Sequence, residues 1–297
     1  MSENLSEIDA KKIEEIRNNG VGNVVSEELL HMYSVLKEEI FIVPYDHGDF
    51  KVYVYWPKES KEKLPLYVNA HGGGFVKGMR QQDIVFARNV SSNVECVVMD
   101  IDYTPAPDLM FPGQIYQSYE AVRFAIAHQD EWNIDVSKIA MGGHSAGGSI
   151  TTAVSLLAGQ KEEFKLCLQI LNYAGFDLYK PIQLKRNGYA NPRIKPDKAE
   201  FYNRMYLKED QKLDPLASPL YAPDEMLCKL PDTLIIECDQ DFFCDEGIEF
   251  ARRLMENGVF VMEKSFMNSK HGFLIQRKDE FEEAEKIIFK QLKRAFQ

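Results

Sequence analysis

The chain has few positive charges for its size. Its 297 residues contain 35 Lys and Arg against 46 Asp and Glu, a net charge of -11 and a pI near 5.2. Such a chain repels phosphate groups, so neither nucleic acid nor an anionic membrane is an expected partner. No apolar run approaches the length needed to cross a bilayer, and residues 1–7 are acidic rather than apolar, so neither a membrane span nor a signal peptide is expected. We therefore expect a cytoplasmic protein.

Cysteine is also scarce. The chain has five cysteines, an odd number, with no C-x-x-C pair and no cluster of His and Cys at metal-ligand spacing. The thiols are most simply reduced, as in a reducing compartment. The sequence therefore predicts no disulfide framework, and no metal or cofactor is expected. Internal repeats and low-complexity tracts are absent as well, so we expect residues 1–297 to form a single domain.

A glycine-flanked serine is the first chemical signal that the sequence does contain. Residues 143–147 read G-H-S-A-G, between a short apolar run at 138–141 and a small-residue stretch, predicted helical, at 146–158. Strand, tight turn and helix are the setting of a nucleophile elbow, which raises a serine above a sheet edge. This setting predicts Ser145 as a nucleophile.

A glycine run earlier in the chain suits an oxyanion site. Residues 71–74 read H-G-G-G and follow a predicted strand at 66–70. Glycines let the backbone approach a substrate closely, so we expect the N–H groups of Gly73, Gly74 and Ala146 to stabilise a developing negative charge. His71 is expected to brace this loop, and Phe75 to floor the pocket.

His271 is the best candidate for a general base, because it follows the last predicted strand after a short loop. Imidazole is suited to accepting and returning a proton at neutral pH. Four aspartates are candidates for its carboxylate partner. Asp239, Asp241 and Asp245 all follow one predicted strand, Asp177 follows another, and spacing does not choose among them. The chain order Ser…Asp…His is that of an α/β-hydrolase.

Alternating patterns along the chain predict a mostly parallel sheet with helices on both faces. Strands are expected at 41–44, 50–56, 66–70, 96–101, 139–141, 164–171, 233–238 and 260–266, and helices at 6–18, 26–39, 115–128, 146–158, 197–207, 247–256 and 278–294. The first two strands suggest an antiparallel hairpin at the leading edge.

A long interval between the strands at 164–171 and 233–238 exceeds an ordinary crossover. We expect cap elements at about 1–40 and 177–230. In such a cap Phe201, Tyr202 and Tyr206 could wall a substrate pocket or simply form a small core of their own.

At six places the chain resembles the hormone-sensitive-lipase-like esterases, bacterial family IV of the α/β-hydrolases. The shared motifs are H-G-G-G-F at 71–75, D-Y at 102–103 with A-P and F-P at 106–107 and 111–112, G-H-S-A-G-G at 143–148, D-P-L-A-S-P at 214–219, D-F-F-C-D-E-G at 241–247 and H-G-F at 271–273. The family's D-x-x-x-D-E-G segment implies Asp241 as the acid of the triad. The resemblance implies a serine carboxylesterase for short-chain acyl esters, with Phe75, Tyr202, Tyr206 and Phe242 at the substrate.

The chain departs from the family at His144, where an aspartate is usual. G-H-S-A-G also resembles arylformamidase-type relatives, so hydrolysis of an amide is one alternative. A non-catalytic ligand receptor on the same fold is another, although receptors usually lack the triad histidine. The expected partner is a small-molecule ester. The sequence does not determine the oligomeric state, for which a homodimer is a candidate.

Overall fold

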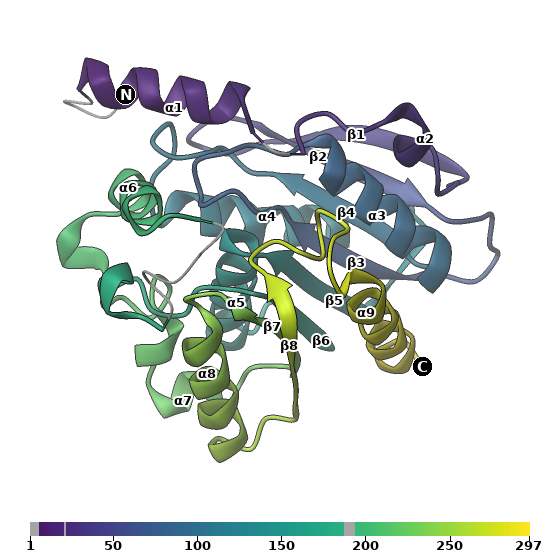
Figure 1. Cartoon of the computed structure of the whole chain (residues 1–297). Coiled ribbons are helices and arrows are strands. Elements are labelled where there is room, and N and C mark those ends of the chain that lie inside the picture. Colours follow the sequence, from purple (N-terminus) through teal and green to yellow (C-terminus); the bar gives the residue numbers. More distant parts are fainter. Residues whose placement is uncertain (1–5, 21, 187–193) are drawn as a thin grey trace.

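The computed structural model describes residues 6–20, 22–186 and 194–297, and its centre is one eight-stranded sheet (Figure 1). The strand order is β1-β2-β4-β3-β5-β6-β7-β8. The strands are β1 (Lys37–Val43), β2 (Phe50–Trp56), β3 (Leu64–Ala70), β4 (Val97–Asp102), β5 (Ile134–His144), β6 (Leu168–Asn172), β7 (Asp232–Gln240) and β8 (Val261–Lys270). β2 pairs antiparallel with both β1 and β4, and every other pairing is parallel.

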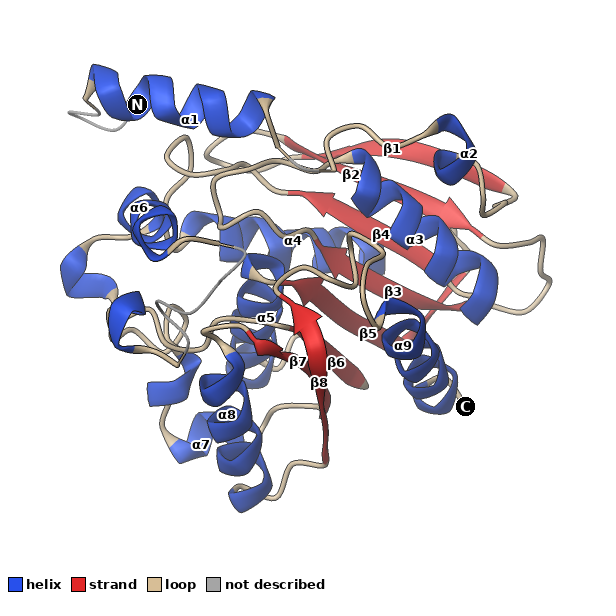
Figure 2. Cartoon of the chain, in the orientation of Figure 1, coloured by secondary structure: helices blue, strands red, loops and turns tan. Residues whose placement is uncertain are grey.

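Helices cover both faces of the sheet, as Figure 2 shows. One face carries α3 (Gln81–Val94) and α9 (Phe281–Ala295), and the other carries α4 (Gly113–Ala127), α5 (Ala146–Lys161) and α8 (Cys244–Glu256). In β3, Leu66 and Val68 join the core under α4 and α5, whereas Tyr67 joins the core under α3 and α9. Alternate residues therefore enter opposite cores, which is why the central strands are apolar throughout. The predicted α/β architecture is confirmed.

The prediction of one helix over 26–39 was wrong. Only α2 (Glu27–Leu30) is helical there, and β1 begins at Lys37. The backbone N–H of Leu36 donates to Trp56 O, and Lys37 then pairs with Trp56 along the edge of the sheet. Pairing with β2 overrides the helical spacing of the apolar residues in this segment.

Helices α1 (Glu7–Asn18) and α6 (Pro196–Tyr206) meet beside the carboxyl ends of the parallel strands (Figure 1). Ile13 of α1 packs with Phe201, Tyr202 and Met205 of α6. The ion pair between Asp9 and Arg204 adds a contact of 3.1 Å. The two expected cap elements, at about 1–40 and 177–230, are therefore in contact through α1 and α6. Residues 1–5 and 187–193 lie outside the described residues.

Short elements complete the connections: α7 (Asp224–Leu227) and the 3-10 helices η1 (Ile182–Leu184), η2 (Glu209–Gln211) and η3 (Pro219–Tyr221). Within the described ranges, every helix is too short or too polar to traverse a bilayer.

Candidate active site

The candidate catalytic residues gather at the carboxyl ends of four parallel strands. Ser145 directly follows β5, Asp241 follows β7 and His271 follows β8, while the H-G-G-G segment at 71–74 follows β3. Parallel strands end at one edge of a sheet, which is where open α/β sheets bind ligands. Segments up to 200 residues apart in sequence (71 to 271) thus converge.

Ser145 lies on a strained turn between β5 and α5, with φ 55° and ψ -119°. Positive φ is unfavourable for a residue with a side chain, so the surroundings must enforce it. Two glycines make the turn possible. A Cβ on Gly143 would lie 2.4 Å from the backbone of Gly147, and one on Gly147 would lie 2.0 Å from Ala70 O. The helix can therefore cross the sheet closely enough to hold the serine in this conformation.

Two consecutive hydrogen bonds connect Ser145, His271 and Asp241. Ser145 Oγ lies 2.8 Å from His271 Nε2, and His271 Nδ1 lies 2.5 Å from Asp241 Oδ2. Both the imidazole and the carboxylate are buried. The carboxylate can accept a hydrogen bond from Nδ1–H, and in that tautomer Nε2 carries no hydrogen and can accept the serine proton. This geometry is that of a nucleophile with its base and an orienting acid.

The other candidate aspartates have different partners. Asp239 and Asp245 accept from Arg186 at 2.6 and 2.9 Å. Asp177 accepts from the backbone N–H groups of Tyr179 and Lys180. Among the four aspartates left open by spacing, it is Asp241 that meets the imidazole.

The backbone N–H groups proposed for the oxyanion site have no acceptor within the described part of the chain. Those of Gly73, Gly74 and Ala146 donate no hydrogen bond there. Gly73 and Gly74 have φ of 135° and 61°, and both line the cavity beside Ser145. Ala146 is the first residue of α5, so the positive end of the helix dipole adds to its N–H. These groups are suited to an oxyanion.

Side chains from two neighbouring segments brace this loop. Tyr103 donates its hydroxyl hydrogen to His71 O at 2.8 Å, and its ring stacks on the imidazole of His71 at 4.0 Å between centroids. Arg80 donates to Gly72 O at 3.1 Å. The loop is therefore fixed before a substrate arrives.

His71 and His144 are buried and are not part of the hydrogen-bonded chain. Burial lowers the pKa of each to about 3, so both are neutral at physiological pH. The Nδ1 atom of His144 lies 2.9 Å from the hydroxyl of Tyr173, whose ring packs edge-on against His271 at 5.2 Å. His144 therefore contacts the site through Tyr173.

No group of three or more His, Cys, Asp or Glu in the described ranges could hold a metal ion.

A cavity of about 160 Å³ lies directly over Ser145 and His271. Its polar side chains are Lys77, Arg80, Gln82, Lys198 and Gln276, together with Tyr173 and Tyr202. Sequence reasoning missed Lys77 and Arg80, although two cations within six residues of the H-G-G-G segment on an acidic chain were a signal. Lys198 comes from α6 and could not be placed here without the fold.

The four aromatic side chains expected at the substrate have different surroundings. Tyr202 lines the cavity and packs on the oxyanion loop, where a Cβ on Gly74 would lie 2.2 Å from its ring. Phe75 and Tyr206 stack on each other at 3.7 Å, and Phe242 is buried with Ile182 and Ala199. Phe75, Tyr206 and Phe242 are not among the residues that line the cavity in the described structure.

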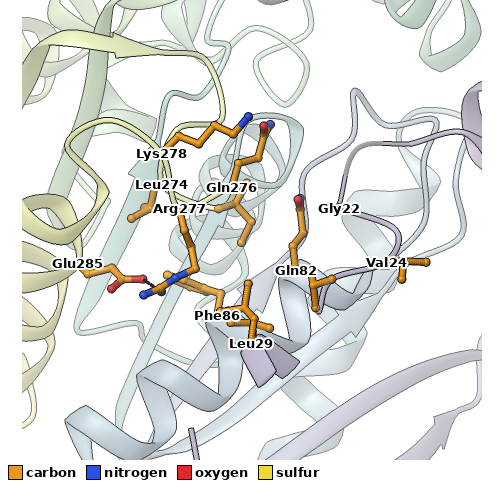
Figure 3. Close-up of a pocket in the computed structure, with 13 residues that line it drawn as sticks. Gly22, Val24, Leu29, Gln82, Phe86, Leu274, Gln276, Arg277, Lys278 and Glu285 are labelled. Atoms are coloured by element: carbon orange, nitrogen blue, oxygen red, sulfur yellow. Dashed lines mark hydrogen bonds and ion pairs between the residues drawn. The ribbon is translucent and has the colours of Figure 1, made fainter. Parts of the chain in front are cut away.

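A second cavity of about 180 Å³ adjoins the first and is lined mainly by apolar side chains. Figure 3 shows Phe86, Leu29 and Leu274 around it, with Gln82 and Gln276 extending toward the same end. Gln82, Ile275 and Gln276 line both cavities. The ion pair between Arg277 and Glu285, at 2.7 Å, lies at its wall (Figure 3).

Comparison with known proteins gives matches over most of the chain. A family model described as the alpha/beta hydrolase fold matches residues 67–275. An arylesterase of Saccharolobus solfataricus is 33% identical over 213 residues, which cover 70% of this chain and 68% of that protein. The carboxylesterase NlhH of Mycobacterium tuberculosis is 30% identical over 230 residues, or 76% of this chain and 72% of the relative.

Solved structures match nearly the whole chain. An esterase of Pyrobaculum calidifontis superimposes with a TM-score of 0.87 at 26% identity, covering 99% of this chain and 95% of the other. The carboxylesterase EstE1, cloned from a metagenomic library, gives a TM-score of 0.87 at 25% identity and covers 99% and 100%.

Proposed function

Because the chain belongs to the α/β-hydrolase family, in its hormone-sensitive-lipase-like branch, we propose that it is a serine carboxylesterase acting on short-chain acyl esters. The observation that carries this proposal is the pair of hydrogen bonds, 2.8 and 2.5 Å, that connects Ser145, His271 and Asp241.

In the proposed reaction, Ser145 Oγ attacks the ester carbonyl while its proton passes to His271 Nε2. Asp241 holds the imidazole in the required tautomer and stabilises its positive charge. The N–H groups of Gly73, Gly74 and Ala146 donate to the oxyanion. Collapse breaks the bond to the alcohol, which leaves with the proton from His271. Water then attacks the acyl-Ser145 ester by the same steps, and the acid is released with Ser145 restored.

Cavity size supports a short acyl chain. A cavity of about 150 Å³ holds benzene, and the space over Ser145 is about 160 Å³. Each methylene that fits contributes about 0.8 kcal/mol of apolar burial, and the gain stops when the cavity is full. We propose that activity peaks between acetyl and hexanoyl esters. We also propose that α1 and the segment around α6 form the cap that limits the cavity, since Tyr202 of α6 lies at its wall.

A series of p-nitrophenyl esters from acetyl to dodecanoyl, assayed beside N-formylkynurenine, tests the proposal. We expect hydrolysis of the short esters, with a fall beyond hexanoyl and no jump in rate for emulsified long-chain triglyceride. Faster turnover of N-formylkynurenine would favour the amide hydrolase, and no turnover of either would favour the receptor. Ser145→Ala gives the background rate for each compound.

The cytoplasmic location and the homodimer stay predictions. The five cysteines are free thiols, which supports a reducing compartment for the protein. Cell fractionation and size-exclusion chromatography with light scattering would test the location and the assembly.

A further inference from the structure

The cavity over Ser145 is lined by cations and by no anion. Lys77, Arg80 and Lys198 all line it, whereas no Asp or Glu of the described residues does. The chain as a whole has more acidic than basic residues, 46 against 35. From this composition, acidic rather than basic side chains would be expected around an arbitrary cavity of the chain.

Arg80 already has partners within the protein. Its Nε lies 3.4 Å from Asp83 Oδ2, and Asp83 is fully buried. The guanidinium also donates to Gly72 O at 3.1 Å. The hydrogen-bond donors of the Arg80 fork are thus partly engaged with Asp83 and with the loop at 71–74.

Lys77 and Lys198 have no such partner. Neither lysine forms an ion pair with an acidic side chain in the described ranges, and their charges oppose each other. Lys77 is half-buried, and burial, with the charges of Arg80 and Lys198, lowers its pKa to about 8. An anion bound between them would offset the repulsion between the two charges and the partial burial of Lys77.

The two lysines come from different elements, and both line the cavity over Ser145. The N–H of Lys77 donates to Gly73 O, so this lysine follows the oxyanion loop within one turn. Lys198 lies one helical turn before Tyr202, whose ring contacts Gly74, and its Nζ lies 5.8 Å from that ring. Because Ser145 lines the same cavity as both lysines, an anion bound by them would lie in the cavity in which the reacting carbonyl must sit.

We propose that the ester cleaved at Ser145 carries a carboxylate, which Lys77 and Lys198 bind. This inference rests on the proposed esterase function and names its substrate class. A monoanion is favoured because the arginine fork, the better match for a phosphate, is engaged with Asp83 and Gly72.

Two matched pairs of esters test the proposal. Mono-p-nitrophenyl adipate and p-nitrophenyl hexanoate differ by a carboxylate on the acyl side, and p-acetoxybenzoate and p-acetoxybenzamide differ by one on the alcohol side. We expect the charged member of at least one pair to have the higher kcat/KM, and the pair that shows it identifies the side that faces the lysines. In Lys77→Gln and in Lys198→Gln the charged-to-neutral ratio of kcat/KM should fall by about fivefold or more. Raising NaCl to about 0.5 M should also lower this ratio, since the Debye length is then about 4 Å.

Lys208→Gln is the matched control, because Lys208 lies just past the other end of α6 and lines no part of this cavity. It should keep the wild-type ratio. A preference for the neutral ester in both pairs, or a ratio that neither lysine variant changes, would overturn the inference while leaving the esterase intact. Failure of the wild type to cleave any of the four esters would instead contradict the esterase itself. Lys198 is exposed, so its variant should fold even where Lys77→Gln does not.

Discussion

Asp239 and Asp241 are two residues apart but serve different partners: Asp241 bonds to His271 at 2.5 Å, and Asp239 bonds to Arg186 at 2.6 Å. The chain turns between them at the end of β7, so one carboxylate enters the site and the other remains at the surface with an arginine. This pair offers a matched test of the proposed acid.

We expect Asp241→Asn to lower kcat by about 10³- to 10⁴-fold, because an amide favours the wrong histidine tautomer. Asp239→Asn should lower kcat less than about threefold, since an exposed ion pair contributes little. Steady-state kinetics, with circular dichroism to confirm the fold, would decide. A larger loss in Asp239→Asn or Asp177→Asn would show that Asp241 is misassigned.

Ser145→Ala should lower kcat by at least about 10⁴-fold while leaving the fold intact. A fluorophosphonate should add to the serine hydroxyl of the wild type and inactivate it. Peptide mass spectrometry would locate the adduct. An adduct at Cys244, or at another serine, would refute the assignment of the nucleophile.

Gly74→Ala tests the oxyanion loop. The added Cβ would meet the ring of Tyr202 at 2.2 Å, so the loop must move, and we expect kcat to fall by about 10²-fold. Gly258→Ala is the control, because Gly258 also has positive φ but its added Cβ meets nothing within 4 Å. Gly258→Ala should lose about 1 kcal/mol of stability in chemical denaturation because of its positive φ, and Gly74→Ala should lose more because its Cβ also meets Tyr202. Equal kcat values in the two variants would contradict the role given to the loop.

His144 should destabilise the protein in acid. Burial lowers its pKa in the folded state from 6.5 to about 3, so between these values the unfolded chain binds a proton that the folded protein does not. Stability due to this group is therefore lost as the pH falls from about 6.5 toward 3. His144→Asn keeps a polar side chain beside Tyr173 but has no titrating group there, so its free energy of unfolding should fall less steeply as the pH is lowered. The two slopes should differ by about 1.4 kcal/mol per pH unit between roughly pH 6 and 4. Parallel slopes in urea titrations would count against a buried neutral imidazole.

The preference for a carboxylate ester should itself depend on pH. Because the pKa of Lys77 is lowered to about 8, its ammonium is charged below that pH and neutral above it. Arg80 and Lys198 are the charged groups that act on Lys77. We expect the charged-to-neutral ratio of kcat/KM, which reports the free enzyme, to fall between about pH 7 and 9. Lys77→Arg, which stays charged, should keep the ratio over that interval. A flat wild-type ratio would argue against Lys77 as a ligand.

Those parts of the fold that depend on local pattern were predictable. The apolar runs predicted the positions of the central strands, and the motifs after them placed Ser145 and His271 at one sheet edge. Asp241 was singled out among four aspartates only by the resemblance to the esterase family. Residues 26–39 were misread because Leu36 and Lys37 bond to a strand some twenty residues later, a contact that the segment itself does not encode.

The lining of the cavity was less predictable than the catalytic residues. Phe75 and Tyr206, both expected at the substrate, bury their rings against each other, and aromatic side chains in a small core look the same in sequence as those at a pocket. Lys198 reaches the cavity only because α6 packs beside the loop that follows β3. Such contacts between distant segments arise from tertiary structure, so no spacing rule would have found them.

The contact between Tyr202 and Gly74 has a consequence for protein engineering. Since the Tyr202 ring of α6 rests on the loop proposed to hold the oxyanion, remodelling α6 to admit larger substrates should lower kcat. Gln82 and Ile275, by contrast, line both this cavity and the apolar cavity beside it. Mutant libraries that aim to widen the specificity of this enzyme should therefore begin at Gln82 and Ile275. Smaller side chains there would join the two cavities and leave the contact between Tyr202 and Gly74 unchanged.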